Sequence, residues 1–147
     1  MADRLQGAER AVKEEPGATL EVLTSEGMTV LAGRSVGNML VERGRDALPE
    51  GIFCANDLLA LGVMQSLTMT HTFRIPEDVA LIGYDDIDFA VSAVVPLSSI
   101  RQPTEALGRT AIELLTEEVE SQNPTHRSVV FTPELVMRQS TASPAAG

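Results

Sequence analysis

The stretch Gly51-Ile-Phe-Cys-Ala-Asn-Asp-Leu-Leu-Ala-Leu-Gly62 joins a short apolar run to the first turns of an apolar helix. Residues 52–55 are typical of a strand that is buried on both faces of a sheet. Asn56 or Asp57 can cap the helix that follows, which the spacing of apolar residues predicts over residues 58–69. The stretch therefore predicts a buried strand that leads directly into a capped helix, the unit from which α/β proteins are built.

Helices and short apolar strands alternate along the rest of the chain. The spacing of apolar residues predicts helices over residues 3–15, within residues 30–43 and over residues 103–120. Gly44 closes the second of these, and Gly33 and Gly37 weaken its first turns, which favours a start at Ser35. Strands are predicted at residues 19–24, 79–83, 98–102, 128–131 and 134–138. This order predicts an α/β fold with a parallel sheet flanked by helices.

Composition places the chain among globular proteins and limits its partners. Of 147 residues, 44% are hydrophobic and 22% charged, which suits one domain with a core. The net charge of −10 repels phosphate backbones, so we expect no DNA binding by this chain alone, although solubility also explains an acidic surface. The single cysteine, Cys54, excludes an intrachain disulfide, and its apolar surroundings favour a buried core position. No run of apolar residues could span a membrane and no signal peptide begins the sequence, so we expect a cytoplasmic protein.

Polar residues follow two of the predicted strands at the points where these strands end. Asn56 and Asp57 follow one strand, and Asp85 and Asp86 follow another. Ligands of parallel α/β sheets bind beyond the carboxyl ends of the strands, and carboxylates and amides suit hydroxyl-rich ligands there. A helix cap explains the first pair equally well, and a turn or cap explains the second.

Other chemistries receive little support from the sequence. The acidic residues Asp85, Asp86 and Asp88 lack the ligand spacing of a calcium loop, so neither a metal nor a cofactor is predicted. Gly33-Arg-Ser-Val-Gly37 matches the GxSxG nucleophile elbow of hydrolases, which would make Ser35 a nucleophile. No firm strand precedes this motif, so a helix start loosened by glycine is the preferred interpretation and an enzyme is not expected.

Five segments resemble segments of the LacI/GalR family of transcription regulators, and they occur in the same order. They are Asp3-Arg-Leu-Gln-Gly7, the opening stretch that ends at Gly62, Arg74-Ile-Pro-Glu-Asp-Val-Ala-Leu-Ile-Gly-Tyr-Asp-Asp86, Pro96-Leu-Ser-Ser-Ile-Arg-Gln-Pro103 and Pro133-Glu-Leu-Val-Met-Arg-Gln-Ser-Thr141. The resemblance extends from about Arg4 to Thr141. It implies a core like that of type I periplasmic binding proteins, in which an effector binds between two subdomains.

The resemblance also implies the residues of the effector site. Arg4, Asn56 and Asp85 match positions that contact the effector in the family. Toward the hydroxyls of a sugar, Arg4 can donate hydrogen bonds, Asp85 can accept them and Asn56 can do both. Some family members place an aromatic platform before the second helix, whereas residues 27–31 here contain no aromatic residue. An unusual effector or a weak site follows.

The resemblance assigns the chain to one part of the family's architecture. Residues 1–141 match the effector-binding and dimerisation domain, with residues 1–95 and 128–141 in the carboxy-terminal subdomain. Residues 96–121 match a remnant of the amino-terminal subdomain, and residues 142–147 form a tail. The DNA-binding headpiece, the hinge and most of the first subdomain have no counterpart in this sequence. A homodimer is implied, with Leu61, Met64, Val91 and Val94 at its interface or, alternatively, in the chain's own core.

We therefore expect the sugar-sensing or small-metabolite-sensing domain of a LacI-type repressor. On its own it should bind effector weakly and should not bind specific DNA. Alternatives are a solute-binding protein of a sugar transporter, which shares the fold, an enzyme on a similar sheet, and an assembly module that pairs with a full-length regulator.

Overall fold

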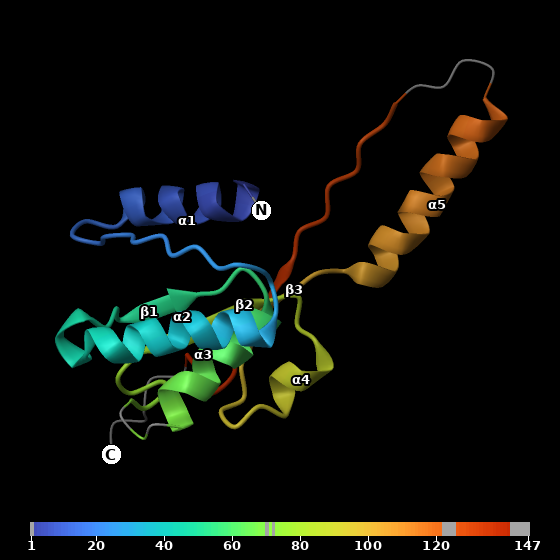
Figure 1. The fold of residues 1–147 in the computed structure, drawn as a ribbon. Coiled ribbons are helices and arrows are strands. Elements are labelled where there is room, and N and C mark those ends of the chain that lie inside the picture. Colours follow the sequence, from blue (N-terminus) through green and yellow to red (C-terminus); the bar gives the residue numbers. More distant parts are fainter. Residues whose placement is uncertain (1, 70, 72, 122–125, 142–147) are drawn as a thin grey trace.

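The strands of the protein form one mixed sheet in the order β1–β2–β3–β4 (Figure 1). The computed structural model describes residues 2–69, 71, 73–121 and 126–141. Strands β1 (Gly51–Phe53), β2 (Ala80–Tyr84) and β3 (Ser98–Arg101) are parallel, and β4 (Glu134–Val136) is antiparallel to β3. The predicted α/β sheet flanked by helices is confirmed, except that its last strand is reversed. The chain leaves β3 toward a distant helix and returns from the same side, so β4 runs in the opposite direction.

The long helices follow the sequence predictions closely. They are α1 (Ala2–Glu14), α2 (Val30–Arg43), α3 (Asp57–Met69) and α5 (Thr104–Glu120), with a 3-10 turn η1 (Arg45–Ala47) and a short α4 (Asp88–Val91) that the sequence did not predict. Helix α2 begins at Val30 rather than at Ser35, because the Thr29 hydroxyl accepts a hydrogen bond from the Ala32 amide and caps it. It ends at Gly44, whose φ of 81° suits glycine.

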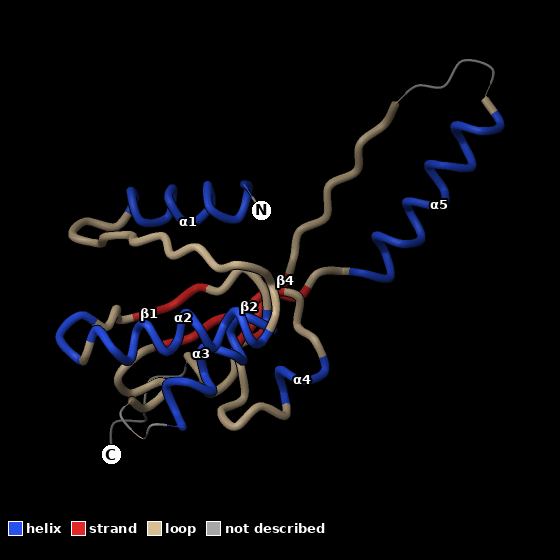
Figure 2. The backbone as a smooth tube through the Cα atoms, in the orientation of Figure 1, coloured by secondary structure: helices blue, strands red, loops and turns tan. Residues whose placement is uncertain are grey.

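Two predicted strands are not formed. Residues 19–24 and 128–131 run as extended loops in Figure 2. The second segment stands apart from the sheet, and Val130 in it is 90% exposed. A strand needs a hydrogen-bonded neighbour, and a local alternation of apolar residues cannot supply one.

Close contact between α2 and α3 explains the glycines of the GxSxG match. A Cβ on Gly33 would lie 2.2 Å from the Leu59 carbonyl oxygen, and one on Gly37 would lie 2.7 Å from the Ser66 Cβ. Ser35 lies within α2, is exposed, and donates a hydrogen bond to the Leu31 carbonyl at 3.2 Å. The motif therefore sits inside a helix and lacks the strand-to-helix turn of a nucleophile elbow.

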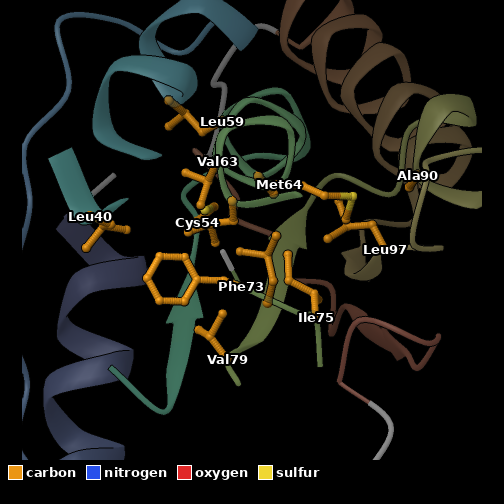
Figure 3. Close-up of a cluster of buried hydrophobic side chains, with 13 residues drawn as sticks. Leu40, Cys54, Leu59, Val63, Met64, Phe73, Ile75, Val79, Ala90 and Leu97 are labelled. Atoms are coloured by element: carbon orange, nitrogen blue, oxygen red, sulfur yellow. The ribbon is translucent and has the colours of Figure 1, made fainter. Parts of the chain in front are cut away.

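The hydrophobic core lies between α3 and the sheet, with α2 packed beside α3 (Figure 3). Its buried members are Leu40, Cys54, Leu59, Ala60, Val63, Met64, Leu67, Phe73, Ile75, Val79, Leu81, Ala90 and Leu97. The prediction of a buried Cys54 is confirmed. Burial raises the pKa of its thiol to about 12, so the reactive thiolate is not formed near neutral pH.

Helix α5 stands away from the sheet, and none of its residues is buried (Figure 1). Strand β3, in contrast, lies in the middle of the sheet. The chain leaves the sheet after β3, and the predicted subdomain division at residue 96 stays a prediction. The predicted tail, residues 142–147, lies outside the described residues. Within the described part of the chain, no helix is long and apolar enough to cross a membrane.

Candidate ligand-binding site

Arg4 links α1 to the rim of the sheet at the ends of β1 and β2. Its Nη2 lies 3.8 Å from Oδ1 of Asp85, and its Nη1 donates a hydrogen bond to the carbonyl of Ala55. The guanidinium stacks on the ring of Tyr84, 3.6 Å from the ring centre. Arg4, Asp85 and the backbone of Ala55 thus come together at this rim, whereas no hydrogen bond joins the Asn56 side chain to Arg4 or Asp85 among the described residues.

Asp85 presents an acceptor at this rim. Its backbone has a φ of 103°, and its amide donates to the Ile100 carbonyl of the neighbouring strand at 2.9 Å. Its Oδ1 accepts a hydrogen bond from Nε2 of Gln102 at 2.8 Å. The side chain remains 36% exposed, so a ligand hydroxyl can reach the carboxylate.

Asn56 is buried and acts as the cap of α3. Its Oδ1 accepts from the Leu59 amide at 2.9 Å, and its Nδ2 donates to the Met28 carbonyl at 3.1 Å. The capping alternative therefore describes its contacts in the protein, whereas contact with a ligand stays a prediction. The side chain also ties the loop before α2 to the start of α3.

Two rim residues were missed by the sequence analysis. Tyr84 supplies the ring under Arg4, and Gln102 supplies the donor to Asp85. A signal for both was present, since Tyr84 closes β2 and Gln102 follows β3, and parallel strands end at the same edge of a sheet. Gln102 reaches the rim because β3 lies beside β2 in the sheet, and the local sequence does not show this pairing.

The other two aspartates near the rim point inward. Asp57 is 1% exposed and accepts hydrogen bonds from Ser99 and from the Ile87 amide. Burial raises its pKa, and these two hydrogen bonds oppose that rise. Asp86 accepts from Nε of Arg101 and Nη1 of Arg138, each at 2.7 Å. Of the aspartates at 57, 85 and 86, Asp85 is therefore the one whose side chain is most open to solvent.

The four residues predicted for a dimer interface differ in exposure. Met64 is 2% exposed and belongs to the chain's own core, so its side chain offers no surface to a partner. Leu61 is half-buried, whereas Val91 and Val94 are 60% and 84% exposed. An open pocket of about 550 Å³ lies beside Val91 and is also lined by Pro96, Met137, Arg138 and Gln139. The interface itself stays a prediction, now without Met64.

Comparison with known proteins identifies the family. Residues 1–141 match the periplasmic binding protein-like domain. The ribose operon repressor of Haemophilus influenzae is 34% identical over 140 residues, which are 94% of this chain and 41% of that protein. A LacI-family regulatory protein from Chloroflexus aggregans aligns with a TM-score of 0.82 and 33% identity, over 96% of this chain and 50% of the other.

The transcriptional regulator CelR, solved in complex with cellobiose, aligns with a TM-score of 0.81 and 31% identity, over 95% of this chain and 42% of that one. The chain thus spans half or less of the length of these relatives. All three are regulators, and none supports the alternative of a transporter's solute-binding protein. This chain belongs to the periplasmic binding protein-like domain family, in the form that LacI-type transcription regulators carry.

Proposed function

We propose that this chain is the effector-sensing part of a LacI-type regulator and that it binds a sugar or a similar polar metabolite at the rim formed by Arg4, Asn56 and Asp85. The observation that carries the proposal is the meeting of Arg4 from α1 with Asp85 from the end of β2, 3.8 Å apart. A donor and an acceptor that face one another on an open rim can bind neighbouring hydroxyls of one ligand. The cellobiose complex of CelR supports a sugar as the ligand class.

The chain carries one wall of the site, so we expect weak binding. In a type I binding-protein core the effector lies between two subdomains, and this sequence covers about two fifths of the ribose operon repressor. The exposed apolar side of α5 is an argument for a second wall in a longer protein, because it could pack against another subdomain. Its residues are Leu107, Ile112, Leu115 and Val119. Effector binding would then shift the two subdomains and change operator affinity through a DNA-binding headpiece. A regulator acts where the genome is, which supports a cytoplasmic location.

A titration followed by amide NMR tests the proposal, because it detects affinities in the millimolar range. With ribose, glucose or cellobiose as the probe, we expect saturable shifts at the amides of Asp85 and Gln102. Arg4→Gln should abolish them, while Arg10→Gln, which changes an exposed arginine of the same helix, should not. Shifts that survive Arg4→Gln, or tight binding by this chain alone, would contradict the proposal.

We also propose a homodimer that uses Leu61, Val91 and Val94. The two valines lie on and just after α4, and both are largely exposed. Phe89 on the same short helix is 68% exposed and enlarges this apolar surface. Exposed apolar side chains on α4 and in the segment after it favour burial against a partner.

A further inference from the structure

The buried carboxylate of Asp57 accepts hydrogen bonds from two segments outside its own helix. Its Oδ1 accepts from the Ser99 hydroxyl on β3 at 2.6 Å, and its Oδ2 accepts from the Ile87 amide after β2 at 2.8 Å. It does not cap α3, because the Asn56 side chain already holds the Leu59 amide. A buried carboxylate is unfavourable unless its oxygens are hydrogen-bonded. The two hydrogen bonds to Asp57 therefore offset the cost of burying it and join α3 to β3 and to the loop after β2.

Ser99 connects Asp57 to the Asp86 amide through a second hydrogen bond. Its hydroxyl proton points to Asp57, so its oxygen is free to accept from the Asp86 amide at 3.0 Å. Ser99 and Asp57 are both essentially buried, at 0% and 1% exposed. Ser99 on β3 accepts from the amide of residue 86, and Asp57 on α3 accepts from the amide of residue 87.

The loop held in this way has an unusual backbone. Asp85 and Asp86 have φ angles of 103° and 53°, in the region that side chains other than glycine avoid. Such conformations are unfavourable for residues other than glycine and persist only where the surroundings impose them. The amide contacts to Ser99 and Asp57 impose the conformation directly after Asp85, the residue whose carboxylate faces the ligand.

The sheet is shaped to receive the Asp57 carboxylate. A Cβ on Gly83 would lie 2.0 Å from Asp57 Oδ1, so β2 carries no side chain at the point where the carboxylate lies. Asp86 is fixed from its other end as well, by Arg101 and Arg138. The space, the two amides and the two arginines all serve the same three-residue loop.

We propose that Asp57 and Ser99 form a positioning clamp, which holds residues 85–87 in the conformation that presents Asp85 to Arg4 and to the ligand. Neither clamp residue touches the ligand. Their effect on binding passes through the backbone of the loop. The effect of the clamp on ligand binding rests on the proposed function. The effect of the clamp on the conformation of residues 85–87 does not.

The test compares Ser99→Thr with Ser99→Val in the full chain. The two side chains have the same shape and differ in the hydroxyl that the clamp needs. A positive φ brings the amide and α protons of one residue close together, so Asp85 and Asp86 should each give a strong intraresidue NOE. We expect Ser99→Thr to keep both NOEs and slow exchange of the Ile87 amide, and Ser99→Val to lose them. Ser66→Ala, which removes a buried hydroxyl between α2 and α3, should change neither.

Asp57→Asn keeps the test decisive if Ser99→Val does not fold. It preserves the size of the side chain but leaves only one oxygen for two donors, so we expect a weakened Asp86 NOE and faster exchange at Ile87. Unchanged NOEs and exchange in Ser99→Val and Asp57→Asn would overturn the clamp. Glucose and cellobiose titrations separate the two proposals. If the wild-type chain shows the Asp85 and Asp86 NOEs and slow Ile87 exchange but binds no sugar, the sugar site alone is refuted. If Ser99→Thr and Ser99→Val bind sugar equally well, the positioning role alone is refuted.

Discussion

Similar carboxylates have different roles in this protein because their surroundings differ. Asp85 keeps an exposed carboxylate at the rim, whereas Asp57 is enclosed and Asp86 is held by two arginines. Asp78 is a fourth case, since it lies between Arg45 and Arg74 on the surface. What a carboxylate does here depends on which donors surround it and whether solvent still reaches it.

Asp78 gives a prediction about acid stability. Hydrogen bonds from Arg45 and Arg74 hold its pKa well below the ordinary value of 3.8. The folded chain therefore keeps Asp78 ionised at a pH where the unfolded chain binds a proton. Its stabilising effect is complete above the ordinary carboxyl pKa and is lost as pH falls below about 4. In urea unfolding between neutral pH and pH about 3, Asp78→Asn should lose less stability on acidification than wild type. Asp46→Asn, a change at an exposed aspartate of η1, should behave like wild type. An unchanged pH dependence in Asp78→Asn would refute this assignment.

At the scale of elements, backbone proximity between α2 and α3 determines the packing. Gly33 and Gly37 on α2 and Gly62 on α3 leave no room for a side chain, and a Cβ on Gly62 would lie 2.1 Å from the Val30 carbonyl. The closeness of the two helices explains why glycines that weaken an isolated helix are tolerated within α2.

Two glycine substitutions should therefore have opposite effects. Gly33→Ala places a methyl group 2.2 Å from a backbone carbonyl that cannot move aside, and we expect a loss of about 1–3 kcal/mol in the free energy of unfolding. Gly108→Ala lies in α5 with nothing within 4 Å, and we expect a gain of about 0.5–1 kcal/mol from helix propensity. Urea unfolding followed by circular dichroism measures both. Equal effects of the two changes would show that helix propensity, and not contact between α2 and α3, determines the outcome.

At the scale of the whole molecule, the exposed apolar surfaces are concentrated on parts that contribute little to the core. Helix α5 has no buried residue, and the surface around α4 exposes Phe89, Val91 and Val94. Such surfaces are costly in water and favour contact with other protein. We propose that the α4 surface contacts a second copy of the chain and that the α5 surface contacts the second subdomain of a longer protein.

Val94→Asp tests the first of these assignments. In a dimer the substitution would bury a charge without a partner, so we expect the dimer to dissociate in sedimentation velocity. The stability of the monomer should change by less than about 0.5 kcal/mol, because Val94 is 84% exposed in one chain. Val119→Asp alters a valine of similar exposure on α5 and should leave the dimer intact. A dimer that survives Val94→Asp, or a monomeric wild type, would count against this interface.

The sequence carried most of the fold and part of the site. Apolar spacing placed the long helices, and the polar residues after two strands indicated the rim. The strands expected at residues 19–24 and 128–131 failed because pairing depends on a neighbour that local sequence does not contain. For Met64 the sequence left a dimer interface and the chain's own core open, because an apolar helix position looks the same in either place, and its burial in the structure places it in the core.

Local sequence by itself determined the alternation of helices and strands, a cap for α3 at Asn56 or Asp57 and the buried character of Cys54, since these depend on neighbours a few residues away. Only the tertiary structure decided that Asp85 faces outward while Asp57 faces inward. That choice rests on Ser99, Ile87 and Gly83, which come from other strands and loops and become neighbours of Asp57 only after the sheet has formed.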